Sequence, residues 1–213
     1  MFTKSILYVL SILFFSYIET TVPIIYSVES VPLIHHVITS SISNYMLYNN
    51  SQYILNIFEQ PQETQSPLVL YFPVFSCAYG LYDLYNVIRN KKSLDFILPG
   101  VLFSTLGLIF MYYENFHWIY SGLLMETSSV FLLFIRKPSN TIRHCFAISF
   151  FFYRNIVFPY ISFLFLKKNY MLLIEPEHFQ EKGLMIFLYF INGLNFYWGY
   201  KIANKLIRHI KNE

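Results

Sequence analysis

The chain has 213 residues, of which 55% are hydrophobic and only 13% are charged. Soluble domains carry about 25% charged residues, so this chain has too few of them to cover a water-facing globule. The basic residues behind its net charge of +3 are dispersed and form no Lys/Arg block, which argues against nucleic-acid binding.

About seven apolar segments approach or exceed the length of about 20 residues that a membrane-spanning helix needs. They run near Ser5–Ser27, Val31–Asn49, Leu68–Ile88, Leu94–Tyr113, His117–Ile135, Ile142–Leu166 and Gly183–Leu206. A membrane β-barrel would need strands of alternating polarity, and the apolar segments do not alternate. Inside lipid every backbone polar group must be bonded within the protein. We therefore predict an all-α fold, a polytopic transmembrane helical bundle with about seven spans.

The first segment could be either a secretory signal peptide or a retained helix. Lys4 and the apolar run after it resemble the start of a signal peptide. The following stretch, Glu19–Pro23, has no cleavage pattern of small residues. We therefore expect a retained transmembrane helix.

The charges between the segments predict the orientation. Basic residues gather after the third and fifth segments and in the tail: Arg89, Lys91 and Lys92, then Arg136, Lys137 and Arg143, then Lys201, Lys205, Arg208 and Lys211. The turns on the opposite side carry Glu59, Glu63 and Glu114. Because cytosolic loops are enriched in Lys and Arg, the C-terminus is predicted to be cytosolic. With seven spans the N-terminus is lumenal, which Lys4 opposes, whereas an even number would put both ends in the cytosol.

The early apolar segments contain ionisable residues. These residues are candidates for function, because burying them in a membrane is costly. His35 and His36 lie in the second segment and point about 100° apart on a helix. One interhelical hydrogen bond and one ring at the membrane boundary is one interpretation, and a functional histidine is the other. Asp83, near the end of the third segment, could reach water, pair with Arg89 or serve a site.

The later segments carry a second polar set. Glu126 lies near the middle of the fifth segment and Arg154 near the middle of the sixth. They could form a buried ion pair between neighbouring helices, or line a polar cavity that holds a lipid headgroup or an acyl carrier. Asn195, Tyr197 and Trp198 in the last segment add hydrogen-bonding groups, although Tyr and Trp also serve as interface anchors.

Four stretches, in order, resemble the TLC domain, the membrane domain shared by the translocation-associated membrane protein, the ceramide synthases and the ceroid-lipofuscinosis protein of the endoplasmic reticulum. Ala78-Tyr79 with Asp83 resembles the family's Gly-Tyr…Asp helix, and Glu126 to Phe131 resembles its Glu-x-Ser-Thr-Pro-Phe stretch, with Ser128 at the serine. Phe151 to Arg154, followed by Pro159, is similar to Phe-Phe-x-x-Arg…Pro. The stretch from Leu194 to Ile202 is similar to the final Leu-Asn-x-Tyr-Trp…Lys-Ile helix.

The resemblance implies a domain organisation and a function. It implies an N-terminal transmembrane helix over residues 1–30 and a TLC-like transmembrane domain over 31–210. It also implies an internal membrane, such as the endoplasmic reticulum, and a role in membrane lipid homeostasis, lipid sensing or trafficking. The predicted polar cavity is lined by His35, Asp83, Glu126, Ser128, Arg154, Asn195, Tyr197 and Trp198, and the predicted partners are membrane lipids.

The alternative function is that of an acyl-CoA-dependent N-acyltransferase, as in ceramide synthases. Its candidate catalytic residues are His35, His36 and Glu126, and acyl-CoA would be its only cofactor. Ceramide synthases carry a His-His pair in the helix after the Gly-Tyr…Asp helix, and the aligned stretch here, Asp95 to Leu102, has no histidine. A residue that could accept the amine proton is missing at that place, so no catalytic residue is assigned.

Other classes fit less well. A receptor or transporter is the lowest alternative, since receptor-type triplets and repeated halves are missing. The sequence shows no metal-binding spacing or phosphate-binding loop, and Cys77 and Cys145 lie in apolar runs typical of buried free thiols. Gly100, Ser104 and Gly107 fall on one helix face, which favours close helix packing and leaves room for a helix-mediated oligomer.

Overall fold

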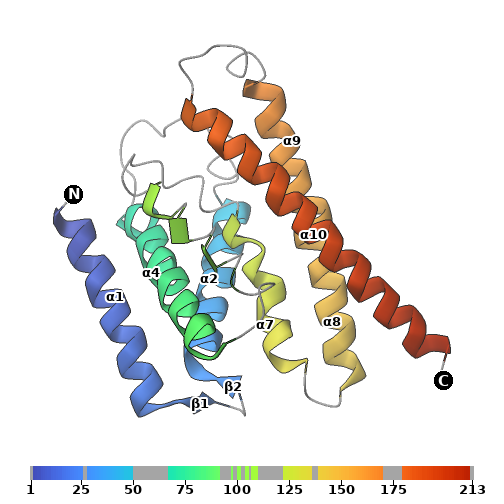
Figure 1. Cartoon of the computed structure of the whole chain (residues 1–213), viewed down its shortest axis with the longest axis horizontal. Coiled ribbons are helices and arrows are strands. Elements are labelled where there is room, and N and C mark those ends of the chain that lie inside the picture. Colours follow the sequence, from blue (N-terminus) through green and yellow to red (C-terminus); the bar gives the residue numbers. More distant parts are fainter. Residues whose placement is uncertain are drawn as a thin grey trace. The chain divides into compact units, whose positions relative to one another are not determined.

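The computed structural model divides into two compact units, Met1–Leu123 and Leu124–Glu213. Figure 1 shows its helices and strands, coloured along the chain. The structure describes residues 2–25, 28–49, 67–91, 97, 100–101, 104–105, 107–109, 122–135, 139–169 and 179–211.

The first unit begins with two helices joined by a short hairpin. Helix α1 (Phe2–Thr21) ends earlier than the predicted Ser27, and strands β1 (Ile24–Ile25) and β2 (Val28–Glu29) follow as an antiparallel pair. Pro23 explains the early end, because a proline restricts the preceding residue to extended conformations and cannot donate to a helix. The prediction that the first helix continues to Ser27 is therefore wrong, and this hairpin is an addition to the all-α prediction.

Helices α2 (Ser30–Asn49) and α4 (Pro67–Arg89) confirm the second and third predicted helices almost to the residue. α1 packs along α4, and α2 contacts both of them. The predicted fourth helix lies largely outside the described residues, but those described between 97 and 109 are helical.

The small-residue face of that fourth segment packs against α4. A Cβ atom added at Gly107 would lie 2.5 Å from Sγ of Cys77, and one added at Gly100 would lie 3.4 Å from the Leu84 side chain. Ser104 between them is buried. The face that the sequence offered for close packing is thus used inside the unit, because only residues without bulk allow this approach.

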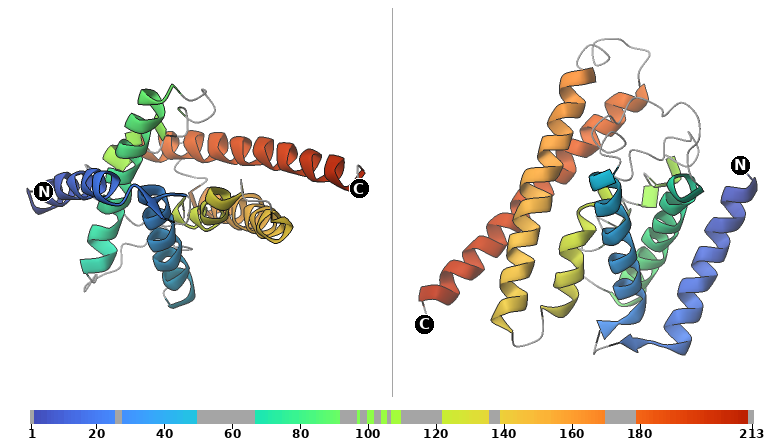
Figure 2. Two further views of the ribbon diagram at one scale, coloured as in Figure 1. Left: turned by 90° about the horizontal axis from the view of Figure 1, so that it is seen from below. Right: turned by 180° about the vertical axis from the view of Figure 1, so that it is seen from behind.

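The second unit contains a long interrupted helix. α7 (Glu126–Phe134) precedes α8 (Asn140–Phe150), which continues through the π-helix η1 (Phe151–Val157) into α9 (Phe158–Asn169). Figure 2 shows α8 to α9 as one continuous rod with α10 (Phe179–Lys211) beside it. The predicted fifth helix, His117–Ile135, is described from residue 122 onward. There the prediction of one continuous helix is wrong, because a turn at Leu124–Met125 precedes α7.

The π-helix ends two residues before Pro159. Proline has no N–H for the usual helical bond, and its ring clashes with the carbonyl one turn earlier. The wider turn places the Phe158 N–H on the carbonyl of Tyr153, five residues back. Single π-turns of this kind occur often at functional sites, and this one contains Arg154.

One helix among the described residues is long and apolar enough by itself to cross a membrane. It is Asn140–Lys167, which has 28 residues and contains an 18-residue stretch with a mean hydropathy of 1.4, whereas Ser5–Thr21 is a shorter apolar helix. α10 is longer, with 33 residues, or about 50 Å at 1.5 Å per residue.

Candidate functional site

In the first unit, His35 lies inside an aromatic cluster built by α1, α2 and α4. Its ring stacks on that of Tyr79 at a centroid distance of 3.6 Å and an interplanar angle of 10°. Phe15 meets the His35 ring edge-on at 6.4 Å, and Phe75 stacks at 6.0 Å. Only 1% of His35 is exposed. The histidine is thus part of the hydrophobic core that joins these helices.

One polar contact of His35 is local. Its Nε2 atom lies 3.1 Å from Oγ1 of Thr39, one helical turn along α2. His36 is half-buried, and its ring meets those of His35 and Tyr79 edge-on at 5.3 and 5.5 Å. This environment suits a packed, hydrogen-bonded ring better than a base that must reach a substrate proton.

Asp83 occupies the same unit, half-buried on α4 one turn after Tyr79. Its neighbour Tyr82 is buried, and its side chain forms hydrogen bonds with Glu19 and Asn86. Tyr82 therefore ties the end of α1 to the end of α4. Tyr79 and Tyr82 were not predicted as site residues, although the family-like Ala78-Tyr79 stretch marked the position of the first.

In the second unit, Arg154 binds two serines of α7. Its Nε donates to Oγ of Ser128 at 2.8 Å, and its Nη2 donates to Oγ of Ser129 at 3.0 Å. The Ser128 hydroxyl in turn donates to the carbonyl of Met125 at 2.8 Å. Both serines are buried, so η1 and α7 are joined through a charged group held by hydroxyl oxygens.

Two further groups act on the same guanidinium. Glu126, at the start of α7, interacts with Arg154 electrostatically. The ring of Phe150 lies 5.4 Å from Cζ of Arg154, within range of a cation–π interaction. The sequence predicted that Glu126 and Arg154 interact, but it did not predict that serines bind the arginine. The repeated serine after Glu126 was the available signal.

Asn195 reaches the same turn of α7 from α10. Its Nδ2 donates to Sδ of Met125 at 3.2 Å, and the residue is 1% exposed. Among the residues that the structure describes, its Oδ1 is buried without a hydrogen-bond partner. One turn earlier, Asn192 donates to Oγ of Ser162 on α9 at 2.9 Å. Two side-chain amides, that of the buried Asn195 and that of the half-buried Asn192, therefore hold α10 on the rest of the unit.

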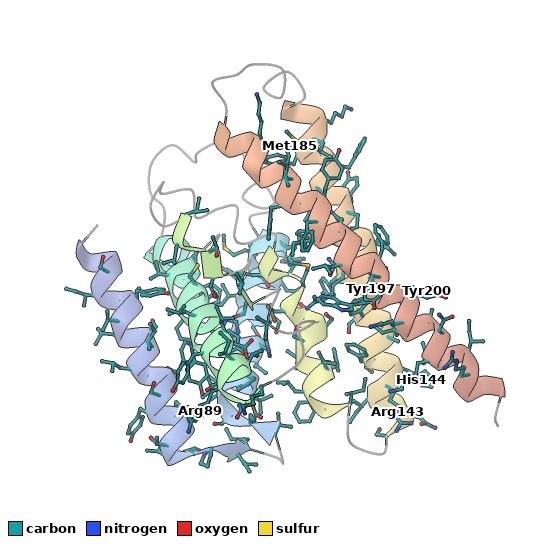
Figure 3. The ribbon with its side chains drawn as sticks, in the orientation of Figure 1. Arg89, Arg143, His144, Met185, Tyr197 and Tyr200 are labelled. Carbon is teal, nitrogen blue, oxygen red and sulfur yellow. The ribbon has the colours of Figure 1, made fainter. Side chains whose placement is uncertain are left out.

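The remaining predicted residues of α10 lie elsewhere. Tyr197, labelled in Figure 3, is 47% exposed. Nζ of Lys201 lies 4.4 Å from its ring centroid. Trp198 is half-buried. An exposed tyrosine beside a lysine is typical of an anchor at a membrane interface.

The structure thus groups the predicted residues by unit. Within the second unit, Glu126, Ser128, Arg154 and Asn195 meet around residues 125–129, and we call these four the Arg154 cluster. Within the first, His35 and Asp83 lie on neighbouring helices. The single cavity expected from the sequence combines residues of both units and stays a prediction.

No metal site emerges among the described residues, since none of them form a group of at least three His, Cys, Asp or Glu side chains. In the same part of the chain, Cys77 is a buried free cysteine and Cys145 a half-buried one.

The comparisons with known proteins identify a family. The family model of the TLC domain matches residues 26–204. None of the curated proteins and none of the solved structures matches significantly. Because the family model covers most of the chain, the chain belongs to the TLC domain family and is a membrane protein.

Proposed function

We propose that the chain is a multi-pass protein of an internal membrane, such as the endoplasmic reticulum, that acts in membrane lipid homeostasis, lipid sensing or trafficking. The proposal assigns the recognition of a lipid headgroup to the Arg154 cluster. It keeps about seven spans, with the C-terminus in the cytosol. Membership of the TLC domain family supports the membrane character. The Arg154 cluster supports the recognition of a lipid headgroup.

The observation that carries the proposal is the arrangement around Arg154. A cation at the centre of an apolar helix is costly unless it meets a partner or a polar ligand. The two serines occupy only part of its N–H donors, and a guanidinium binds phosphate and carboxylate groups well because its donors are planar and fixed. The buried Oδ1 of Asn195 adds an acceptor for a ligand hydroxyl or amine.

The orientation follows from the charges at the helix ends. Lys201, Lys205 and Arg208 lie in the last turns of α10, whose length exceeds the membrane core of about 30 Å. Basic residues beyond the hydrocarbon favour the cytosolic side.

An N-acyltransferase is the second candidate, and the surroundings of His35 favour it less. A general base must come within hydrogen-bond reach of its substrate, whereas the His35 ring is stacked and buried. Purified protein incubated with a fatty acyl-CoA and a long-chain amine decides this question. A product that disappears in the His35→Ala/His36→Ala variant would establish the enzyme, and product formation equal to that of the variant would exclude it.

The main experiment compares cellular lipids. Full-length protein, the Arg154→Gln variant, the exposed-site control Lys167→Gln and an empty vector are expressed at matched abundance, and sphingolipids and phospholipids are quantified. We expect wild type and Lys167→Gln to shift the same lipid class, and Arg154→Gln to resemble the empty vector. Identical lipid profiles in all four samples would refute the proposal.

A further inference from the structure

The second unit carries an apolar groove on its surface, and none of the four residues of the Arg154 cluster lines it. It has a volume of about 480 Å³ and lies between the α8–η1 rod and α10. Its apolar lining consists of Ala147, Ile148, Phe151, Phe152, Ile156 and Leu206. The exposed fractions of Ile148 (70%) and Ile156 (60%) show that the groove is open on its outer side.

The groove has the length of one membrane leaflet. It runs along the rod from His144 to Ile156, which corresponds to about 18 Å of helix. Half of a hydrocarbon core of about 30 Å is roughly 15 Å. A groove of this depth that begins at the end of a membrane-spanning helix matches a single acyl chain of the leaflet on that side.

The entrance of the groove is basic. His144 lines it, and Arg143 lies one turn before Ala147 on the same side of α8. Figure 3 shows both side chains near the start of α8. The sequence has no Asp or Glu between Glu126 and Glu175, nor between Glu181 and Glu213. The helices that form this groove therefore offer no carboxylate to neutralise Arg143.

We propose that this groove binds an anionic phospholipid of the cytosolic leaflet, with one acyl chain along the lining and the phosphate against Arg143 and His144. An apolar, bilayer-facing groove excludes water-soluble ligands, and the charge at its entrance selects against zwitterionic headgroups. Basic sites between transmembrane helices on the cytosolic side bind anionic headgroups in this way. The site rests on the proposed cytosolic side of these helix ends, but it does not depend on the headgroup site proposed at Arg154.

Quenching of a tryptophan placed in the groove tests the proposal. Trp118 and Trp198 are replaced by phenylalanine in the full-length chain, and Phe152→Trp supplies the reporter. The protein is reconstituted in two kinds of phosphatidylcholine vesicle. One contains phosphatidylserine with brominated acyl chains, and the other contains the same amount of phosphatidylcholine with brominated acyl chains. We expect quenching to show that phosphatidylserine binds beside the reporter tryptophan about five times more strongly than phosphatidylcholine does.

Matched variants separate the site from general charge attraction. Arg143→Gln/His144→Gln should remove the preference, whereas Lys167→Gln, a change at the other end of the same rod, should leave it intact. A reporter at Phe163→Trp, exposed on α9 but outside the groove lining, should show none. Ile148→Trp provides a second groove reporter should Phe152→Trp fail to fold.

Equal quenching by the two brominated lipids would overturn the proposal. So would a preference that persists without Arg143 and His144, or that is as large at Phe163→Trp. None of these readouts depends on cellular lipid composition. The groove proposal can therefore fail while the proposed role in lipid homeostasis holds, and that role can fail while the groove proposal holds.

Discussion

Arg154 is a charged group with three kinds of partner in its surroundings. Serine hydroxyls bind Nε and Nη2, a phenyl ring covers the guanidinium, and Glu126 supplies negative charge. Hydrogen bonds to charged groups contribute about 1.5–3 kcal/mol each, more than those between neutral groups. The serines of α7 therefore matter for stability as well as for the position of the arginine.

Removing both serine hydroxyls should destabilise the protein strongly. Ser128→Ala/Ser129→Ala should lower the free energy of unfolding by about 3 kcal/mol, because the buried guanidinium loses its acceptors. Ser149→Ala is the control: that buried serine only donates to the carbonyl of Phe146 within its own helix, so its loss should cost about 1 kcal/mol or less. Thermal unfolding of the reconstituted proteins measures both, and equal effects would contradict the role assigned to the serines.

His35 supports a second prediction at this scale, which separates packing from catalysis. His35→Ala should cost about 2–4 kcal/mol, since it leaves a cavity among stacked rings, and His36→Ala should cost less because that ring is only half-buried. His35→Phe keeps a stacked ring but loses the contact to Thr39, so it should cost about 1 kcal/mol. It should also leave the cellular lipid phenotype unchanged. A lipid phenotype lost in His35→Phe at normal stability would instead assign the histidine a chemical role.

At the scale of elements, glycine and proline decide how the helices approach one another. Gly107 allows the fourth segment to reach Cys77 of α4, and Gly199 of α10 allows the approach of Asn155 in η1, where an added Cβ would lie 2.5 Å from Nδ2. Pro159 fixes where the long rod widens. These close contacts therefore position the helices that carry the polar residues.

Adding one methyl group should have opposite effects at two glycines. Gly107→Ala should destabilise by about 1–3 kcal/mol through overpacking against Cys77. Gly193→Ala, at a helical position where an added Cβ meets nothing within 4 Å, should stabilise by about 0.5–1 kcal/mol. Combining Gly107→Ala with Cys77→Ala should recover part of the loss. Equal effects at Gly107 and Gly193, measured by thermal unfolding, would show that the close packing is not present.

At the scale of the whole molecule, the proposed topology places the stretch between α2 and α4 in the lumen and the tail in the cytosol. The proposal depends on the loop charges and on the number of helices. An odd number of spans must lie between the stretch that joins α2 to α4 and the C-terminal tail, because the two are proposed to lie on opposite sides of the membrane. Each unit is internally packed, and α10 ends in basic residues. A topology measurement therefore tests the whole arrangement at once.

Glycosylation mapping provides that measurement. Gln62→Asn creates an Asn-x-Thr acceptor with Glu63 and Thr64. In a background with Asn49→Gln, which removes the natural Asn-Asn-Ser acceptor, it should be glycosylated in microsomes. A serine added after Glu213 completes an acceptor at Asn212, which should stay unmodified. Modification of the tail acceptor, or of both, would exclude the proposed topology.

The sequence by itself determined the membrane character, most of the helix positions and the family. Each of these rests on local composition: apolar runs, their spacing, and polar residues in a fixed order. It also pointed to the interaction of Glu126 with Arg154, because charges are rare in such runs and each one needs a partner. Two local predictions are wrong: α1 ends before Pro23 and not at Ser27, and a turn at Leu124–Met125 interrupts the fifth predicted helix.

Only the tertiary structure decided what surrounds these residues. The stack of His35 on Tyr79, the binding of Arg154 by Ser128 and Ser129, and the groove between α8 and α10 join residues far apart in the chain. Helical periodicity indicates which residues share a face, but not which neighbouring helix that face meets or at what distance. That depends on how side-chain volumes fit between helices, and one sequence does not specify it by pattern alone.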